Sequence, residues 1–468
     1  MMAEILFAGA AGNVTGSCTI FKNGTESVMI DCGMYQERNL QSRNWEKPVE
    51  DLKSIKSVLL THAHLDHCGR LPKLVKDGFH GRIYGTPATL EIVQYLLYDS
   101  AHLQLEDVKR KKRRHEKQGR LSPFPYEPLY EAEDVDATIK LFTPVTYKKP
   151  IEVAHNIRAS FFEAGHIFGS SMIEIEFKDG QETKTIVFSG DVGRWDLPII
   201  NDPYQFQKAD FMVVESTYGD RTHGTVASIP DELERVINDT AKRGGNIIIP
   251  GFAVERTQEI LYHLTGLLKE RRIPHLMTFV DSPMAVSVTE IFKKHSELFD
   301  EETRDLILAG NSPYDFPGLT MCRSADQSRA INNIKGVSII IAGSGMCTGG
   351  RIKHHLVNNL GREESTILFV GYQAVGTLGR QILEKPEEVR IFGEYVPVKA
   401  HIEKISGFSG HADRDELVRW LSSMKSPPAQ VFINHGDPAS SESLKQHFSD
   451  KLGFKSTVAE YKKSYLLS

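Results

Sequence analysis

The 468-residue chain contains no apolar run near the roughly 18 residues that a membrane-spanning helix requires. It also has no overall excess of basic charge, since 56 Lys and Arg residues stand against 61 Asp and Glu residues, a net charge of −5. The composition, 40% hydrophobic and 25% charged, is that of ordinary soluble protein. Integral membrane and disordered proteins are therefore excluded, and any affinity for phosphate groups must come from local patches.

Cysteine is scarce, and the five residues do not form a pattern. An odd number without CxxC spacing is typical of reduced thiols and does not indicate a disulfide framework. The N-terminus carries Glu4 where a signal peptide would carry positive charge, and we interpret it as the first strand of the fold. We therefore expect a cytoplasmic protein without membrane contact.

Two patterns of apolar residues divide the chain. In the first half, short β-branched runs alternate with glycine-marked turns and with helical spacing, for example over 87–114. From about Phe211, strands alternate with longer helical segments such as 230–243 and 255–272, which is typical of βαβ units and a parallel sheet. The tail again resembles the first half. The fold class is therefore α/β, with a second domain inserted into the first.

Residues 62–67 read HAHLDH and follow the apolar strand SVLLT. Histidines at i and i+2 of an extended segment project to one side, and the following turn can bring Asp66 and His67 to a neighbouring point. Imidazoles combined with carboxylates suit zinc, and a pair of ions about 3.5–4 Å apart is a common centre for phosphate ester hydrolysis. A metal site is predicted here.

HAHLDH, with Asp31 before it and with His166 and Asp191 after it, resembles the four ordered motifs of the metallo-β-lactamase superfamily. The later segments VVESTYG, GFSGHAD and INHGD, which contain Glu215, His411 and His435, are similar to those of its β-CASP branch, nucleases that process RNA and DNA. The resemblance implies an αββα sandwich with an inserted β-CASP domain, a parallel sheet flanked by helices. It places the metallo-β-lactamase domain at 1–218 and 400–468, and the β-CASP domain at 219–399.

The same resemblance implies two Zn²⁺ ions per chain. It assigns one to His62, His64, His166 and Asp191, and the other to Asp66, His67, Asp191 and His435, so that Asp191 bridges the pair.

It also implies roles for residues around the metals. Asp31 would orient a ligand histidine through its second ring nitrogen, and Asp66 would contribute to catalysis as well as to the metal. His411, held by Glu215, would give a proton to the leaving oxygen. A histidine at the position of His435 is found in the RNA-acting members of the family, so the substrate implied is single-stranded RNA.

Glycine-rich segments in the second half are candidates for phosphate contact, because backbone N–H groups at the start of a helix can hold an anion. The loop GSGMCTGGR at 343–351 is one of them, although it lacks the GK[ST] ending of a Walker A loop. Similar loops face the cleft of the β-CASP enzymes. The candidate RNA-binding residues are Arg256, Ser344, Gly345, Arg351, Arg380 and Ser409.

The strongest local block of charge is KRKKRR, residues 109–114, inside a long helical pattern. Such a block forms either a solvated helix face or a surface that captures RNA outside the catalytic site, and the sequence leaves both open.

The sequence thus predicts a zinc-dependent ribonuclease that acts as an endonuclease, a 5′ exonuclease or both. Two alternatives are a hydrolase of a non-nucleic-acid ester and a catalytically silent scaffold of RNA processing. The first shares HAHLDH but does not need Glu215, His411 and His435, and the second would be expected to have lost metal ligands. A homodimer is left open as the assembly.

Overall fold

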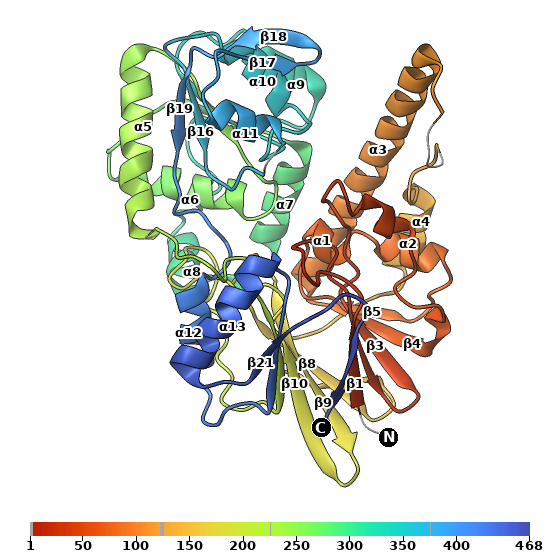
Figure 1. The fold of residues 1–468 in the computed structure, drawn as a ribbon. Helices are drawn as coiled ribbons and strands as arrows, with labels where there is room; N and C mark the ends of the chain where they lie inside the picture. The colour runs from red at the N-terminus through yellow and green to blue at the C-terminus, as the bar shows by residue number, and fades with distance from the viewer. Residues whose placement is uncertain (1–2, 122–125, 225, 375) are drawn as a thin grey trace. The chain divides into compact units, whose positions relative to one another are not determined.

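The computed structural model describes residues 3–121, 126–224, 226–374 and 376–468. It separates into two compact units, of which unit 1 comprises 1–195, 202–222 and 411–468, and unit 2 comprises 196–201 and 223–410. Both units mix helices and strands, which confirms the predicted α/β class (Figure 1). None of the described helices has both the length and the apolar character that crossing a membrane requires.

Unit 1 contains two seven-stranded sheets. The first has the order β22-β1-β2-β3-β4-β5-β6, and the second has the order β21-β20-β11-β10-β9-β8-β7. The first sheet consists of β1 (Ala3–Phe7), β2 (Thr19–Asn23), β3 (Glu26–Ile30), β4 (Ile55–Leu59), β5 (Arg82–Gly85), β6 (Phe142–Pro144) and β22 (Ser464–Leu467). The second consists of β7 (Ile151–Ala154), β8 (Ile157–Glu163), β9 (Ser171–Asp179), β10 (Glu182–Phe188), β11 (Phe211–Glu215), β20 (Gln430–Asn434) and β21 (Ser456–Val458).

The two sheets of unit 1 pack face to face. Alternate residues of β1 are buried, and Ile5 and Phe7 join Phe21 of the first sheet and Phe161 and Phe177 of the second in one apolar core. Alternation of buried and exposed residues is expected for a strand with one face on a core and the other toward an outer layer. This core fixes the register of both sheets, and hence where the loops at their ends emerge.

Helices form the outer layers of unit 1. They are α1 (Leu65–Cys68), α2 (Leu71–Lys76), α3 (Pro87–Gln118), α4 (Ala132–Ile139), α12 (Arg414–Leu421) and α13 (Pro438–Leu452). On the second sheet, Trp420 of α12 and Phe448 of α13 pack against Met212 and Val214 of β11. α1 to α4 follow or flank strands of the first sheet, so unit 1 has the αββα arrangement that the resemblance implied.

Unit 2 is built on a parallel sheet with the order β14-β13-β15-β12-β16-β19. Its strands are β12 (Ile247–Pro250), β13 (Met277–Asp281), β14 (Leu319–Met321), β15 (Ser338–Ala342), β16 (Thr366–Phe369) and β19 (His401–Lys404), and a hairpin of β17 (Glu388–Ile391) and β18 (Glu394–Pro397) stands apart. Its helices are α5 (Ile229–Arg243), α6 (Arg256–Lys269), α7 (Pro283–Lys294), α8 (Glu301–Leu308), α9 (Ala325–Ile331), α10 (Ile352–Asn359) and α11 (Leu378–Leu383).

Burial on both faces explains the continuous isoleucine runs of this sheet. Ile248 and Ile340 pack with α9, α10 and α11 on one face, and the neighbouring Ile247 and Ile339, which point the other way, are buried as well. Parallel strands covered on both faces characteristically read as unbroken apolar runs.

The compact units divide at 222/223 and 410/411, close to the predicted domain boundaries at 218/219 and 399/400, which stay predictions. The strand β19, His401–Lys404, pairs in parallel with β16 and so belongs to the sheet of unit 2.

Candidate metal centre

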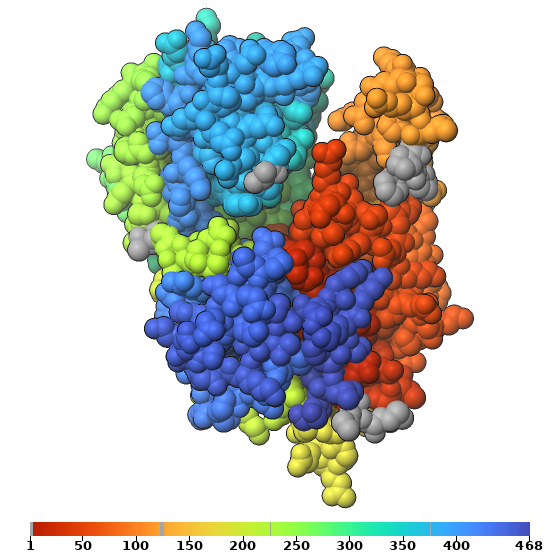
Figure 2. All heavy atoms as spheres, in the orientation of Figure 1, coloured from red at the N-terminus to blue at the C-terminus, as the bar shows by residue number. Residues whose placement is uncertain are grey.

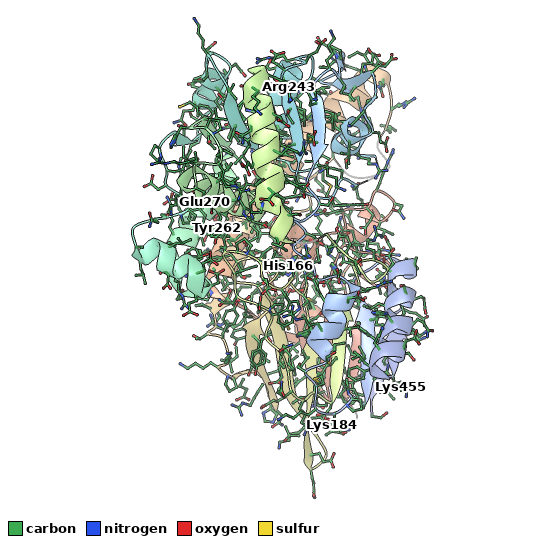
Figure 3. All side chains as sticks on the ribbon, turned by 90° about the vertical axis from the view of Figure 1, so that its left-hand side faces the viewer. His166, Lys184, Arg243, Tyr262, Glu270 and Lys455 are labelled. Atoms are coloured by element: carbon green, nitrogen blue, oxygen red, sulfur yellow. The ribbon has the colours of Figure 1, made fainter. Side chains whose placement is uncertain are left out.

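HAHLDH lies where the first sheet of unit 1 meets α1. β4 ends at Leu59, the chain bends at Ala63, and α1 begins at Leu65. His62 and His64, on either side of this bend, bring their rings together, and the first turn of α1 presents Asp66 and His67. His166 follows β8 in the facing sheet, and Figure 3 shows it at the opposite end of that sheet from Lys184. The ends of both sheets therefore contribute to one site.

Three histidines and one carboxylate form the first cluster of donor atoms. His64 Nδ1 lies 3.1 Å from His62 Nε2 and 3.3 Å from His166 Nε2. Asp191 Oδ2 lies 3.4 Å from His62 Nε2 and 3.6 Å from His166 Nε2. Burial lowers the pKa of His64 to about 4, against the opposing pull of Asp66 and Asp191, so its imidazole is neutral, as a ligand must be.

Asp66, His67 and His435 form a second cluster. His67 Nε2 lies 3.0 Å from His435 Nε2, and His435 Nε2 lies 3.7 Å from Asp66 Oδ2. Asp191 takes part through its other oxygen, since its Oδ1 lies 3.3 Å from His67 Nε2. In each cluster the donor atoms lie within 4.8 Å of one another.

Asp191 is the residue common to the two clusters. Its Oδ1 is buried and makes no hydrogen bond of good geometry among the described residues, although Nε2 of His67 lies 3.3 Å away and Nδ1 of His435 lies 3.6 Å away. A buried carboxylate oxygen that is so poorly hydrogen-bonded is costly unless a cation neutralises it. The donor set, imidazole nitrogens with hard carboxylates, is the one that zinc prefers, so these residues fit a pair of metal ions.

Asp31 lies directly behind the metal ligands. Its Oδ2 is 2.7 Å from Nδ1 of His67, and its Oδ1 accepts a hydrogen bond of 2.8 Å from the backbone N–H of Thr61. The residue adopts the left-handed conformation, with φ of 60°, which turns its carboxylate from the end of β3 toward the histidines. A ligand imidazole whose second nitrogen meets a carboxylate is held in one orientation and tautomer.

Thr61 is a site residue that the sequence analysis missed. Its hydroxyl lies 2.9 Å from Asp31 Oδ2 and 3.0 Å from Nδ1 of His62. One side chain therefore contacts a histidine of the first cluster and the carboxylate that holds His67 of the second. The available signal was a hydroxyl residue directly before the first histidine of HAHLDH. Because Thr61 is fully buried, these contacts are not shared with solvent.

His411 and Glu215 form a pair at the edge of the centre. His411 Nδ1 lies 3.1 Å from Glu215 Oε2 and 3.9 Å from Asp191 Oδ2. The carboxylate of Glu215 also accepts a hydrogen bond of 2.7 Å from the N–H of Val192, the residue after Asp191. Burial disfavours the charged imidazolium of His411, but Glu215 and Asp191 outweigh it and raise its pKa to about 9. A protonated imidazole next to a metal pair can serve as a general acid.

The candidate RNA-binding residues all lie in unit 2, whereas the metal-binding candidates all lie in unit 1. Arg351 donates to the buried Asp281 at 2.7 Å and to the carbonyl oxygens of Cys322 and Arg323. Asp281 also lies 2.7 Å from Nε2 of the buried His355. The guanidinium of Arg351 thus ties the glycine-rich loop to β13, a contact that sequence reasoning did not foresee.

The other candidates of this set have varied surroundings. Arg256 pairs with Glu259 and lies over the ring of Phe408, and Arg380 pairs with Glu384 at 2.7 Å. The hydroxyl of Ser344 accepts from the N–H of Thr348 at 3.0 Å. A Cβ at Gly345 would meet the ring of Phe252 at 2.6 Å, so a larger residue here would displace that ring. Ser409 precedes the unit boundary. Their role in RNA binding stays a prediction.

Three family descriptions match successive parts of the chain. Residues 11–203 match the metallo-beta-lactamase superfamily, residues 257–382 match the Beta-Casp domain, and residues 395–459 match the Zn-dependent metallo-hydrolase RNA specificity domain. With the relatives described next, they show that the chain belongs to the β-CASP branch of the metallo-β-lactamase superfamily. The predicted family is confirmed.

The curated relatives are nucleases and termination factors by name. The chain is 37% identical to Ribonuclease TTHA0252 of Thermus thermophilus over 92% of both chains. It is 30% identical to Transcription termination factor FttA of Methanosarcina mazei, covering 92% of this chain and 66% of that protein. It is 28% identical to an RNase J-like protein of Methanocaldococcus jannaschii, with 93% of each chain covered.

A solved structure is similar over the whole chain. The crystal structure of a protein of unknown function from Enterococcus faecalis V583 aligns with a TM-score of 0.56, 12% sequence identity and full coverage of both chains. At this identity the likeness supports the fold alone.

Proposed function

We propose that this protein is a zinc-dependent ribonuclease that hydrolyses phosphodiester bonds in single-stranded RNA. The observation that carries the proposal is the position of Asp191, which offers Oδ2 to one cluster of histidines and Oδ1 to another. Two adjacent cation sites that share a carboxylate, with a proton-donating histidine beside them, suit in-line displacement at phosphorus.

We assign one zinc ion to His62, His64, His166 and Asp191, and a second to Asp66, His67, Asp191 and His435. When bound, such a pair supplies a hydroxide near neutral pH and stabilises negative charge on the phosphoryl oxygens. Asp31 and Thr61 keep the ligand imidazoles in the orientation that this work needs. We expect the protein to act in the cytosol, where its five buried thiols stay reduced.

His411 is our candidate for the general acid. Departure of the 3′ oxygen requires a proton, and Glu215 holds His411 by Nδ1, which leaves Nε2 to donate. The negative charge of Glu215 also favours this role, because it stabilises the protonated imidazole of His411 until the proton is transferred. The products expected are a 5′-phosphate and a 3′-hydroxyl.

RNA is the substrate best supported among nucleic acids. The segment that matches the RNA specificity domain, 395–459, contains both His411 and His435. A relative that covers nearly the whole chain is named a ribonuclease. The resemblance to the family also implies that members acting on RNA have a histidine at the position of His435.

Cleavage of a single-stranded RNA labelled at either end tests the proposal. The wild type supplied with zinc should cut it. In His411→Ala the cleavage rate should decrease by about 10²–10⁴-fold, while the zinc content stays unchanged. Asp66→Ala should lose both cleavage and zinc. Products from the two labels distinguish internal cutting from 5′ trimming. A zinc-loaded wild type that leaves the RNA intact, or a fully active His411→Ala variant, would refute the proposal.

A further inference from the structure

The charged block 109–114 lies on α3, and this helix begins beside the loop that carries His166. Thr86, the residue that caps α3, donates a hydrogen bond of 2.7 Å to the carbonyl of Gly169, and Thr89 donates one of 2.8 Å to the same oxygen. Gly169 belongs to the loop that carries His166. At 1.5 Å per residue, the 32 residues of α3 extend for about 48 Å.

The far half of α3, residues 102–118, is named here the arm. It stands clear of the sheets of its own unit in the ribbon and appears as a separate orange lobe in the space-filling view (Figure 1, Figure 2). The arm carries seven Lys or Arg residues and three Asp or Glu residues, a net charge of +4, whereas the whole chain has a net charge of −5. Positive charge is therefore concentrated on one projecting element.

One face of the arm packs against the returning chain. Gln104, Val108, Lys111 and His115 recur at helical spacing and are the arm residues that are half-buried. Gln104 accepts a hydrogen bond of 3.0 Å from the N–H of Leu129, and the hydroxyl of Tyr126 lies 2.8 Å from His115 Nδ1. These contacts explain why a helix so rich in like charges is held in place.

The opposite face of the arm carries a stripe of cations. Arg110, Arg113, Arg114 and Lys117 recur at i, i+3, i+4 and i+7, so they lie along one side of the helix over two turns. All four are exposed, and Glu116 is the acidic residue beside them. Arg110 is 79% exposed, and its contact with Asp107 is long, at 3.8 Å, so it contributes little to stability. Clustering of like charges without a structural use suggests a ligand of opposite charge.

We propose that this cationic stripe binds the phosphate backbone of the RNA substrate at a distance from the metal centre. From Pro87 to Arg113 the helix rises by about 39 Å, so the stripe lies several turns along α3 from the loop that carries His166, and only a long RNA can occupy both sites. A polyanion is favoured over a protein partner because four cations follow one another over two turns with no aromatic side chain among them. The exposed Leu103 lies on the same side of the arm, two turns before Arg110. The substrate identity rests on the proposed function.

The test compares two quadruple variants. The first carries Arg110→Gln, Arg113→Gln, Arg114→Gln and Lys117→Gln, which remove four charges while keeping residues of similar helix propensity. The control replaces four exposed lysines elsewhere in unit 1 by Gln, so that net charge changes equally. These are Lys425, Lys451, Lys455 and Lys463.

Binding is measured by fluorescence anisotropy in EDTA, where no cleavage occurs, with a single-stranded RNA long enough to span the helix. For the stripe variant, the slope of log K against log salt should decrease in magnitude by about 2–3, since each backbone phosphate contributes about 0.7. The control should keep the wild-type slope. Circular dichroism checks that α3 stays helical. Equal slopes and affinities for the two variants would overturn the proposal and favour a protein as the partner of the arm.

A second readout separates this proposal from the proposed function. With zinc present, an RNA too short to reach the arm should be cut equally by wild type and stripe variant, while the long RNA should show a raised KM in the stripe variant alone. If the wild type cuts neither RNA, the proposed function fails, whereas the binding slopes in EDTA still decide the role of the stripe. Equal KM values for the long RNA would count against the stripe.

Discussion

At the residue scale, the centre depends on how side chains behind the ligands hold the ligands. Asp31 contacts Nδ1 of His67, and Thr61 contacts both Asp31 and Nδ1 of His62. Glu215 has the same relation to His411. In His62 and His67 the supporting residue meets Nδ1, and Nε2 faces Asp191. In His411, Nδ1 meets Glu215 and also lies 3.9 Å from Asp191, which leaves Nε2 for proton transfer.

Thr61 gives the residue-scale prediction. Thr61→Val keeps the shape of the side chain but removes the hydroxyl that meets Asp31 and His62, so zinc affinity should decrease by about 10–100-fold. Thr61→Ser keeps the hydroxyl and is the matched control. Competition with a chromophoric zinc chelator measures the affinity, and thermal melting checks the fold. The same affinity in the valine and serine variants would show that the hydroxyl does not support the centre.

At the element scale, the loops at the strand ends place the ligands, and close backbone packing fixes those loops. Gly33 follows β3, and a Cβ at this position would meet the carbonyl oxygen of Asp66 at 1.5 Å. The N–H of Ser17 donates to this same oxygen at 2.8 Å, and the N–H of Met34 donates to Leu65. The start of α1 is thus held against two other loops through its backbone.

Gly33→Ala should accordingly force α1 away and disturb Asp66 and His67. We expect the free energy of unfolding to decrease by about 2–4 kcal/mol and zinc binding to weaken. Gly266→Ala is a contrasting substitution, because Gly266 lies within α6 with nothing near its Cβ position. Alanine there should increase the free energy of unfolding by about 0.5–1 kcal/mol. Denaturant unfolding of both variants measures the changes. A Gly33→Ala variant as stable as the wild type would contradict this view of the loop.

Long or strongly patterned elements could be predicted from the sequence. The helix now seen as α3 was expected from its apolar spacing, and it continues through the charged block until Gly119, which adopts the left-handed conformation. The short strands β6, β7, β21 and β22 were not expected. β22 has four residues and pairs with β1 at the other end of the chain, so tertiary contact and not local pattern determines it.

The candidate site divides in the same way. The three histidines and the aspartate of HAHLDH indicate a metal site through their spacing, and the structure brings them close to His166, Asp191 and His435. Their role as metal ligands stays a prediction. Thr61 and the link from Arg351 to Asp281 were missed. A threonine or an arginine has many uses, and only the folded chain shows which partner it meets.

At the scale of the whole molecule, the metal-ligand candidates and the RNA-binding candidates lie in different units. Unit 1 is assembled from three stretches of sequence and holds every metal-ligand candidate, including His435 from the returning tail. Unit 2 supplies the Beta-Casp region and the glycine-rich loops. Because the ligands come from distant parts of the chain, the centre can form only when unit 1 is complete, and metal binding should couple to its folding.

The central claim is that two zinc ions bound to one chain form the working centre. The most direct measurement removes metal with a chelator, returns zinc in steps, and follows cleavage of single-stranded RNA at each step. We expect full activity to return only after two equivalents of zinc per chain, and Asp191→Asn, which removes the charge of the shared carboxylate, not to regain it. Full activity at one equivalent, or unchanged activity in the metal-free chain, would rule out a two-zinc centre.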